Sequence, residues 1–272
     1  MRRRQLVELE DQPWLPAVLR DAGTAYLRFS QEVSHQERAL APVLREVLER
    51  SGGSRIVDLG SGSGGPVCAV ARELARAGRP VHVTLTDLHP NAAAFAWLAA
   101  RARDEAAPDG GAVALAIDGE REPVDATRVP PRLRGVRTLF NAFHHFPPDA
   151  ARGVLQSAVD AGEAIAVFEG VSRHPLFLAS MPFAALAAAL SVPLLRPFRW
   201  SWLALAWVVP AIPLLVLWDG VVSCLRVYDE GELRALIDAV DGADRYDWEI
   251  RKIALPPSPV PGIACIGVPR AR

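Results

Sequence analysis

The sequence predicts an α/β fold: a doubly wound, seven-stranded, mostly parallel sheet whose last strand runs antiparallel. Three observations lead to this prediction. From Arg55 onward, short β-branched runs alternate with helical runs, as a parallel sheet requires. A glycine-rich turn, residues 60–65, joins the first of these strands to a helix. The chain ends in two strand-like runs, Tyr246–Ile253 and Gly262–Val268, whose Pro-rich connection predicts an antiparallel hairpin.

The first strand and the turn after it form the most informative stretch. Arg55–Leu59 is short and contains the β-branched residues Ile56 and Val57, as expected for a buried parallel strand. The residues that follow, Gly-Ser-Gly-Ser-Gly-Gly, allow a tight bend and let a ligand approach the backbone, because glycine has no Cβ atom. Pro66 suits the first turn of a helix, where its missing N–H is not needed. We therefore expect a ligand at this turn.

The second strand, residues 81–86, is followed directly by the carboxylate of Asp87. A carboxylate at this place can accept hydrogen bonds from the two hydroxyls of a ribose. This feature suits a nicotinamide dinucleotide and a nucleoside cofactor equally well. The spacing of the glycines in the turn has to distinguish between these two classes of cofactor.

The spacing D-x-G-x-G-x-G, formed by Asp58, Gly60, Gly62 and Gly64, resembles the first motif of class I S-adenosylmethionine-dependent methyltransferases. A dinucleotide-binding domain would instead show G-x-G-x-x-G. The resemblance implies S-adenosyl-L-methionine as cofactor. It implies cofactor contacts at Asp58, Gly60, Ser61, Gly62, Gly64, Asp87 and Leu88. It covers about residues 50–170 and 229–269.

The acidic residue that would contact the adenine has two candidates. The run Val113–Ile117 ends in Asp118, whereas Asp125 and Ala126 precede a proline. The second pattern is similar to the family's acidic residue followed by a small one, so we favour Asp125 with Ala126. Either aspartate could instead be a charge on a surface loop.

The fourth strand and its exit, residues 138–146, end in a pair of histidines. This stretch resembles the corresponding motif of small-molecule methyltransferases related to the ubiquinone and menaquinone enzymes. The resemblance places Asn141 beside the cofactor and His144 and His145 toward the acceptor, where a histidine can act as a general base. The alternative is that one histidine caps the next helix and the other packs in the core.

Charged residues near these strands carry weaker expectations. Glu169 ends the fifth strand and would orient a substrate or pair with an arginine such as Arg173. Arg226 would hold the insertion to the sheet or face the acceptor, but we favour pairing with Asp219 or Glu169, because buried arginines usually occur in ion pairs. The first fifty residues are expected to be helical before the first strand, with Tyr26 as a weak candidate for a cofactor contact.

The insertion after the fifth strand, residues 173–227, is the most unusual part of the chain. Two uncharged apolar runs, Leu176–Leu195 and Leu203–Trp218, flank a short segment with Arg196 and Arg199. A helix of twenty residues is about 30 Å long, enough to cross a bilayer core. Three interpretations follow: a hairpin on the cytoplasmic leaflet, a two-helix membrane span, or a water-soluble lid. Each predicts a small apolar or lipid-like acceptor.

Composition limits the remaining possibilities. The 272 residues predict a helical segment (1–50), a methyltransferase domain (51–172 with 228–272) and the insertion (173–227). A net charge of −1 argues against a nucleic-acid partner. Three scattered cysteines predict neither disulfides nor a zinc site, and we expect no metal. We also expect a reducing compartment, either on the cytoplasmic side of a membrane or in the cytoplasm. The start of the chain lacks the apolar core of a signal peptide. Two other functions stay open: a non-catalytic membrane-associated protein with this fold, and a nucleotide-binding oxidoreductase.

Overall fold

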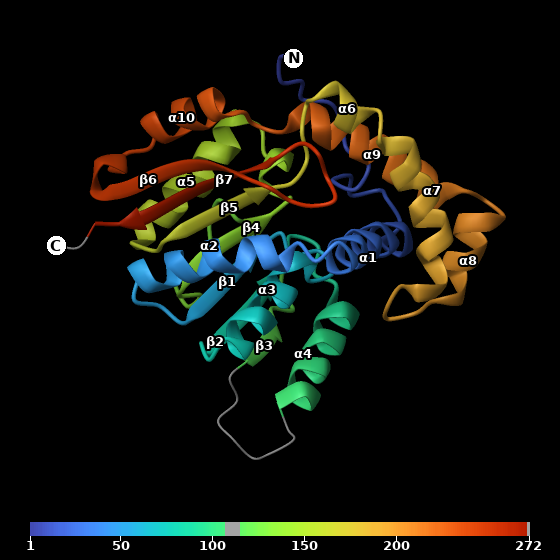
Figure 1. Ribbon diagram of the computed structural model, residues 1–272, viewed down its shortest axis with the longest axis horizontal. Helices are drawn as coiled ribbons and strands as arrows, with labels where there is room; N and C mark the ends of the chain where they lie inside the picture. Colours follow the sequence, from blue (N-terminus) through green and yellow to red (C-terminus); the bar gives the residue numbers. More distant parts are fainter. Residues whose placement is uncertain (107–114, 271–272) are drawn as a thin grey trace.

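The computed structural model describes residues 1–106 and 115–270 and contains a seven-stranded sheet with helices on both faces (Figure 1). The strands are β1 Arg55–Leu59, β2 Val81–Thr86, β3 Leu115–Gly119, β4 Val136–Phe140, β5 Ile165–Glu169, β6 Tyr246–Ile253 and β7 Gly262–Pro269. Their order is β3-β2-β1-β4-β5-β7-β6. Strands β1 to β5 pair in parallel, and β7 runs antiparallel to both β5 and β6. This is the class I methyltransferase fold that the sequence predicted.

The strand order reverses on the two sides of β1, which pairs with β2 on one side and with β4 on the other. At such a point the connections leave the sheet in opposite directions, and a crevice forms beyond the carboxyl ends of the strands. The glycine-rich turn follows β1, so it lies at this crevice.

Two apolar cores cover the sheet. The helices α2 Glu37–Arg50, α3 Gly65–Arg76 and α4 Ala92–Ala106 pack on one face, and α5 Pro148–Ala161 and α10 Glu230–Asp238 pack on the other. Neighbouring residues of β1 face opposite sides, with Ile56 in the first core and Val57 in the second. Asp229 precedes helix α10, and its side chain forms the N-cap as part of a capping box with Glu232.

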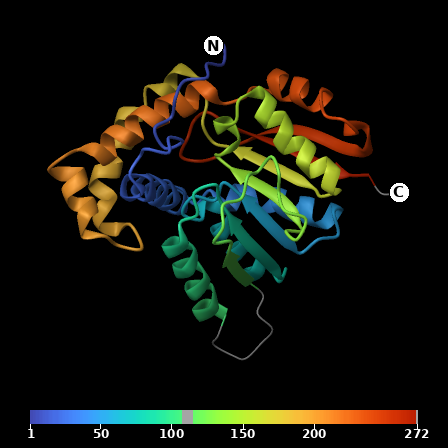
Figure 2. The ribbon, with the colours of Figure 1, turned by 180° about the vertical axis from the view of Figure 1, so that it is seen from behind.

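The insertion forms a separate helical block beside α1 Ala17–Val33, as both views of the ribbon show (Figures 1 and 2). Its helices are α6 Pro175–Leu178, α7 Met181–Ser191, α8 Trp200–Trp207 and α9 Ala211–Arg226. A third apolar core joins α1 to this block and contains Ala25, Val192, Trp202 and Ile212. Short 3₁₀ turns, Phe143–His145, Val192–Leu194 and Ala243–Arg245, complete the described elements.

Within the described residues, one helical stretch, Pro175–Leu194, is long and apolar enough to cross a membrane by length and composition. The pair Trp200–Trp207 and Ala211–Arg226 meets the same criteria together, but its two parts are bent by 74°. This bend comes at Pro210, where a proline cannot continue the helical hydrogen bonds.

The structure corrects one expectation about local structure. Residues 1–16 form an extended arm with turns instead of a helix, and they run over the carboxyl edge of the sheet toward α9. Helix α9 continues past the apolar run that ends at Trp218, through Asp219 to Arg226. Most of β3 lies where it was expected, but residues 113 and 114 are outside the described residues.

Candidate active site

A cavity of about 960 Å³ lies at the carboxyl ends of β1, β2, β4 and β5. Its volume is at the upper end of the roughly 300–1,000 Å³ that ligand pockets usually have. The predicted site residues that line it are Gly60, Ser61, Gly62, Asp87, Leu88, Asp125, Ala126, Asn141, His144 and His145. Tyr26 lines it as well. Asp58 and Gly64, which were also predicted to contact the cofactor, do not line it.

The glycine-rich turn exposes backbone to the cavity. Gly62 has a φ of +55°, a conformation that side chains disfavour. A Cβ atom on Gly62 would lie 3.0 Å from the Thr24 side chain of α1, so α1 closes tightly over the turn. The α3 helix that follows begins at Gly65 and has Pro66 in its first turn, as predicted. The turn is therefore shaped for close contact between backbone and ligand.

Asp58 supports this turn from inside the protein. Its two carboxylate oxygens accept hydrogen bonds from the hydroxyls of Ser61, at 2.7 Å, and Thr138, at 2.6 Å. Burial raises the pKa of Asp58 to about 7, although both hydrogen bonds act to lower it. Asp58 thus positions the turn, and the direct cofactor contact expected from the sequence is not available to it because both oxygens face the interior.

Asp87 lies where the ends of β1 and β2 meet. Its Oδ2 accepts a hydrogen bond from the backbone N–H of Gly62 at 2.7 Å, and its Oδ1 accepts one from the N–H of His89 at 2.8 Å. A carboxylate offers about four acceptor positions, so two are left for other donors. Leu88 beside it is 56% exposed and offers an apolar surface.

The structure separates the two candidate adenine-side aspartates. Asp125 and Ala126 lie on the cavity wall, and Asp125 Oδ1 accepts hydrogen bonds from the backbone N–H and the hydroxyl of Thr127, both at 2.8 Å. Asp118 pairs with His82 at 2.7 Å between β2 and β3, outside this cavity. Of the two, only Asp125 is placed to contact a ligand bound at the turn.

Asn141 follows β4 and has a φ of +51°, in the left-handed region that asparagine tolerates better than most residues. Its Oδ1 accepts a hydrogen bond from the N–H of Gly170 at 2.6 Å, which ties the ends of β4 and β5 together. Such a backbone conformation at a cavity is typical of functional positions. The side chain therefore fixes the wall between the turn and the two histidines.

His144 is buried at the back of the cavity. Its backbone N–H and its Nδ1 both lie in hydrogen-bond contact with Glu169, at 3.0 and 2.7 Å. Because an ionised carboxylate only accepts, Nδ1 carries a proton, whereas Nε2 has no hydrogen-bond partner. Glu169 thus pairs with a histidine, and Arg173 pairs with Asp229 and Glu232 instead.

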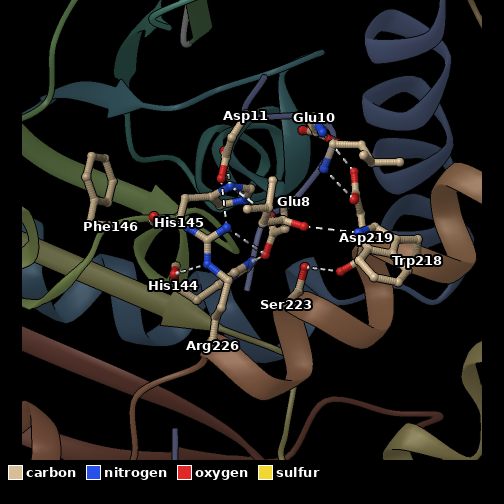
Figure 3. A network of polar contacts seen from close by, with 12 residues as sticks. Glu8, Glu10, Asp11, His144, His145, Phe146, Trp218, Asp219, Ser223 and Arg226 are labelled. Carbon is tan, nitrogen blue, oxygen red and sulfur yellow. Dashed lines mark hydrogen bonds and ion pairs between the residues drawn. The ribbon is translucent and has the colours of Figure 1, made fainter. Parts of the chain in front are cut away.

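His145 is held between two carboxylates. Its Nδ1 lies 2.7 Å from Asp11 and 2.9 Å from Glu8 (Figure 3). Burial alone would lower the pKa of His145, but these two charges raise it well above 6.5. The two carboxylates thus favour the protonated ring over the neutral ring that a general base requires, and the general-base role of His145 stays a prediction. A catalytic role of His144 stays a prediction.

The arm contributes acidic residues that sequence reasoning missed. Glu8, Glu10 and Asp11 all line the cavity. Burial would raise the pKa of Glu8, but the charge of His145 and the hydrogen bond from His145 lower this pKa to about 2. In Glu10, burial raises the pKa to about 8. The acidic run in residues 8–11 is visible in the sequence, but such runs usually lie in solvent, so it gave no signal.

Arg226 ties α9 to the arm. Its Nη1 lies 2.7 Å from Asp11 and 3.4 Å from Glu8, so the expected pairing with Asp219 or Glu169 is wrong. Asp219 instead accepts hydrogen bonds from the N–H groups of Leu9, at 2.7 Å, and Glu10, at 3.0 Å. The sequence could not predict these partners, because they lie more than 200 residues away along the chain.

The insertion forms the apolar side of the cavity. The residues that line it there include Leu176, Phe177, Met181, Ala184, Leu215 and Val216, from α6, α7 and α9. Tyr26 of α1 donates a hydrogen bond from its hydroxyl to the carbonyl of Ala184 at 2.9 Å, which joins the two walls. One cavity thus combines a polar end at the glycine turn with an apolar end under the insertion.

The three cysteines, Cys68, Cys224 and Cys265, are all buried and free. Burial raises the pKa of each thiol to about 12, so none is an activated nucleophile. This agrees with the expectation that they form no disulfide.

Comparison with known proteins gives only structural similarities. No protein-family model and no curated protein matches this chain. It is similar to the methyltransferase domain of bacterial CtHen1, with 10% identity, 86% of this chain and 99% of that one covered, and a TM-score of 0.48. It is also similar to a structure described as a putative Zn-dependent alcohol dehydrogenase from Rhodobacter sphaeroides, with 16% identity, 80% of this chain and 85% of that one covered, and a TM-score of 0.45. A third similar structure is that of mitomycin 7-O-methyltransferase MmcR, with 18% identity, 94% of this chain and 54% of that one covered, and a TM-score of 0.42. The fold assignment comes from the strand order of the sheet.

Proposed function

We propose that this chain is an S-adenosylmethionine-dependent methyltransferase that acts on a small, apolar or lipid-like acceptor. The observation that carries this proposal is the single cavity in which the glycine turn and Asp87 face the apolar wall of the insertion. A dinucleotide-binding oxidoreductase is disfavoured because β7 is inserted antiparallel between β5 and β6.

The residues at the polar end fit the cofactor. The backbone of the turn, where a Cβ on Gly62 would have no room, would lie against its methionine part. The two free acceptor positions of Asp87 would take the ribose hydroxyls, and Leu88 and Ala126 would flank the adenine with Asp125 at its edge. When bound, S-adenosylmethionine supplies an activated methyl group for direct displacement by a nucleophilic acceptor.

The chain itself would mainly align the acceptor and keep water out. The apolar side chains of α6, α7 and α9 provide a surface for an apolar acceptor next to the turn. The arm closes the cavity from the other side through Glu8 and Asp11. No proton acceptor is needed if the acceptor atom is already nucleophilic.

We also propose that the outer face of the insertion rests on a membrane surface. Large apolar side chains that are about half exposed or more are Phe183, Leu186, Leu190, Leu194, Trp200, Trp207, Val208, Val209, Leu214 and Trp218. Phe183, Leu186 and Leu190 recur at helical spacing along α7, and exposed apolar patches are typical of surfaces that contact proteins or membranes. The inner face packs on α1 in the third core, which favours a helical block on the bilayer surface over a span that would draw α1 into the lipid.

Methyl transfer tests the enzymatic part. The purified chain is incubated with S-adenosylmethionine labelled in its methyl group and with an organic extract of lipids and quinones. We expect label to partition into the organic phase with the wild type and not with Asp87→Ala. Label that appears only in protein or nucleic acid would contradict the proposed acceptor class. Label in no fraction, although the cofactor binds, would contradict the enzymatic role.

A further inference from the structure

Two buried polar atoms face each other at the back of the cavity without hydrogen-bond partners. They are Oε1 of Glu8 and Nε2 of His144, 3.8 Å apart, in side chains that are 1% and 2% exposed. Nδ1 of His144 contacts Glu169, so Nε2 is the ring nitrogen that faces Glu8. Nη1 of Arg226 lies 3.4 Å from this oxygen without forming a hydrogen bond, and a metal ion between Oε1 and Nε2 would give both buried atoms a partner.

A third donor atom completes the group. Nδ1 of His145 lies 2.9 Å from the other carboxylate oxygen of Glu8, and the donor atoms of Glu8, His144 and His145 all lie within 4.8 Å of one another. Metal ions bind such atoms at about 2.0–2.2 Å, so two ligand atoms can be up to about 4.4 Å apart. The group needs to contract by only a few tenths of an ångström to surround one ion.

The charges around this group favour a cation. The carboxylates of Glu8, Asp11 and Glu169 meet here, and Arg226 is the only arginine or lysine that forms an ion pair with any of them in the described part of the chain. A divalent ion at this point, together with Arg226, would balance the charges of the three carboxylates.

The surroundings also hold the donors in place. Glu169 accepts from Nδ1 of His144 at 2.7 Å, which is the carboxylate–histidine arrangement that orients histidine ligands in metal sites. On the other side, Asp11 lies 2.7 Å from His145 and is itself paired with Arg226 (Figure 3). Because Asp11 contacts the same Nδ1 atom of His145 that would bind the ion, Asp11 would lie next to the ion and would not orient the ring.

We propose that Glu8, His144 and His145 bind one divalent transition-metal ion, such as Zn²⁺, Mn²⁺ or Fe²⁺, with Asp11 next to it. Two imidazoles and one carboxylate suit these ions better than Mg²⁺ or Ca²⁺, which prefer oxygen ligands. All four residues line the cavity. The side of the ion that faces the cavity is therefore left for an oxygen atom of the acceptor. This role of the ion rests on the proposed function.

Cobalt binding to the full-length, tag-free and chelator-treated protein tests the metal site. Co²⁺ reports its coordination by its visible absorption. We expect one Co²⁺ per chain, and Glu8→Gln and His145→Gln should each weaken binding at least about tenfold. His82→Gln is the matched control, because His82 also lies 2.7 Å from a carboxylate, that of Asp118, but outside the cavity. It should bind Co²⁺ as the wild type does.

Thermal unfolding shows whether a loss of binding reflects the site or the fold. Saturating Co²⁺ should raise the melting temperature of the wild type and of His82→Gln, but not of the two ligand variants. His145 is partly exposed, so His145→Gln keeps the test open if Glu8→Gln does not fold. Wild-type Co²⁺ affinity and spectrum in a folded ligand variant, or no stoichiometric binding by the wild type, would overturn the metal site. S-adenosylmethionine binding by metal-free protein would still support the proposed function.

Discussion

Asp58 shows how one buried residue can shape a ligand site that it does not touch. Its carboxylate is 2% exposed and holds the glycine turn through Ser61 and β4 through Thr138. Burial raises its pKa from 3.8 to about 7. Between these two values the folded chain binds a proton that the unfolded chain has lost, so this residue makes the fold less stable as the pH rises.

Asp58→Asn should remove this pH dependence. Each pKa unit corresponds to about 1.4 kcal/mol, so ionised Asp58 should cost the fold on the order of 4 kcal/mol above pH 7 and little near pH 4. We expect the variant to gain stability relative to the wild type as the pH rises from 5 to 8, measured by urea unfolding. Parallel stability profiles of the two proteins would contradict the raised pKa.

Gly62→Ala tests the close approach at the turn, and Gly78→Ala is its control. Both glycines have a positive φ, +55° and +76°, so both substitutions carry a similar backbone cost of about 1–2 kcal/mol. A Cβ on Gly62 would meet Thr24 at the cavity, whereas one on Gly78 would meet nothing within 4 Å. S-adenosylmethionine affinity should fall at least about tenfold in the first variant and stay unchanged in the second. Equal affinities would show that no ligand lies against the turn.

Single site residues could be predicted where their role depends on their position in a strand or turn. Asp87 and Asn141 directly follow strands, so the topology alone brings them to the crevice. The state of His145 could not be predicted, because it depends on Glu8 and Asp11, more than 130 residues away. The buried position of Asp58 also depends on a partner, Thr138, 80 residues away.

At the scale of elements, the arm and α9 act as one unit. Asp219, in the middle of α9, accepts the N–H groups of Leu9 and Glu10, and the indole of Trp218 donates to the carbonyl of Val7 at 3.0 Å. Arg4 donates its backbone N–H to the carbonyl of Leu225 at 2.9 Å. These bonds replace the helical bonds that the arm lacks, and they carry Glu8 and Asp11 to the histidines.

Asp219→Ala should release the arm. Each partly buried N–H that loses its acceptor costs about 1–3 kcal/mol. We expect the amides of Leu9 and Glu10 to exchange hydrogen for deuterium at least tenfold faster, while the strands of the sheet keep their protection. Asp118→Ala, which removes an aspartate far from the arm, should not change these amides. Unchanged exchange in Asp219→Ala would mean that other contacts hold the arm.

The elements of the sheet were predictable because each carries a local pattern. Apolar β-branched runs indicated the strands, and their alternation with helical runs indicated a parallel sheet. The arm was predicted wrongly as helix because Leu15 and Val18 continue an apolar stripe backward across Pro16. Helix α1 begins only after this proline, and the residues before it bond to α9, which no local pattern reveals.

At the scale of the whole molecule, the two faces of the insertion have different environments. The inner face contributes Ala188, Val192 and Trp202 to the core with α1. The outer face exposes Phe183 at 74% and Trp200 at 77%. The sequence predicted an apolar insertion but could not assign its faces, because α7 and α8 are apolar all round and lack an amphipathic stripe.

Replacing three exposed residues of α7 with serine tests the membrane surface. Phe183, Leu186 and Leu190 lie on the outer face, and burying each such side chain contributes about 1.5–3 kcal/mol. The triple serine variant should bind phospholipid vesicles at least tenfold more weakly in co-sedimentation, with an unchanged melting temperature. Val33→Ser, an exposed apolar residue of α1, is the control. A wild type that ignores vesicles but self-associates would assign this face to a second copy of the chain.

Calorimetric titration of the full chain with S-adenosylmethionine, and separately with NAD, tests the central claim most directly. We predict binding of one S-adenosylmethionine and no NAD in the wild type. Asp87→Ala removes two hydrogen bonds to a charged group, each contributing about 1.5–3 kcal/mol, so its affinity should fall at least about a hundredfold. Asp118→Ala should bind as the wild type does. Uptake of NAD in place of S-adenosylmethionine, or wild-type affinity in Asp87→Ala, would contradict the account.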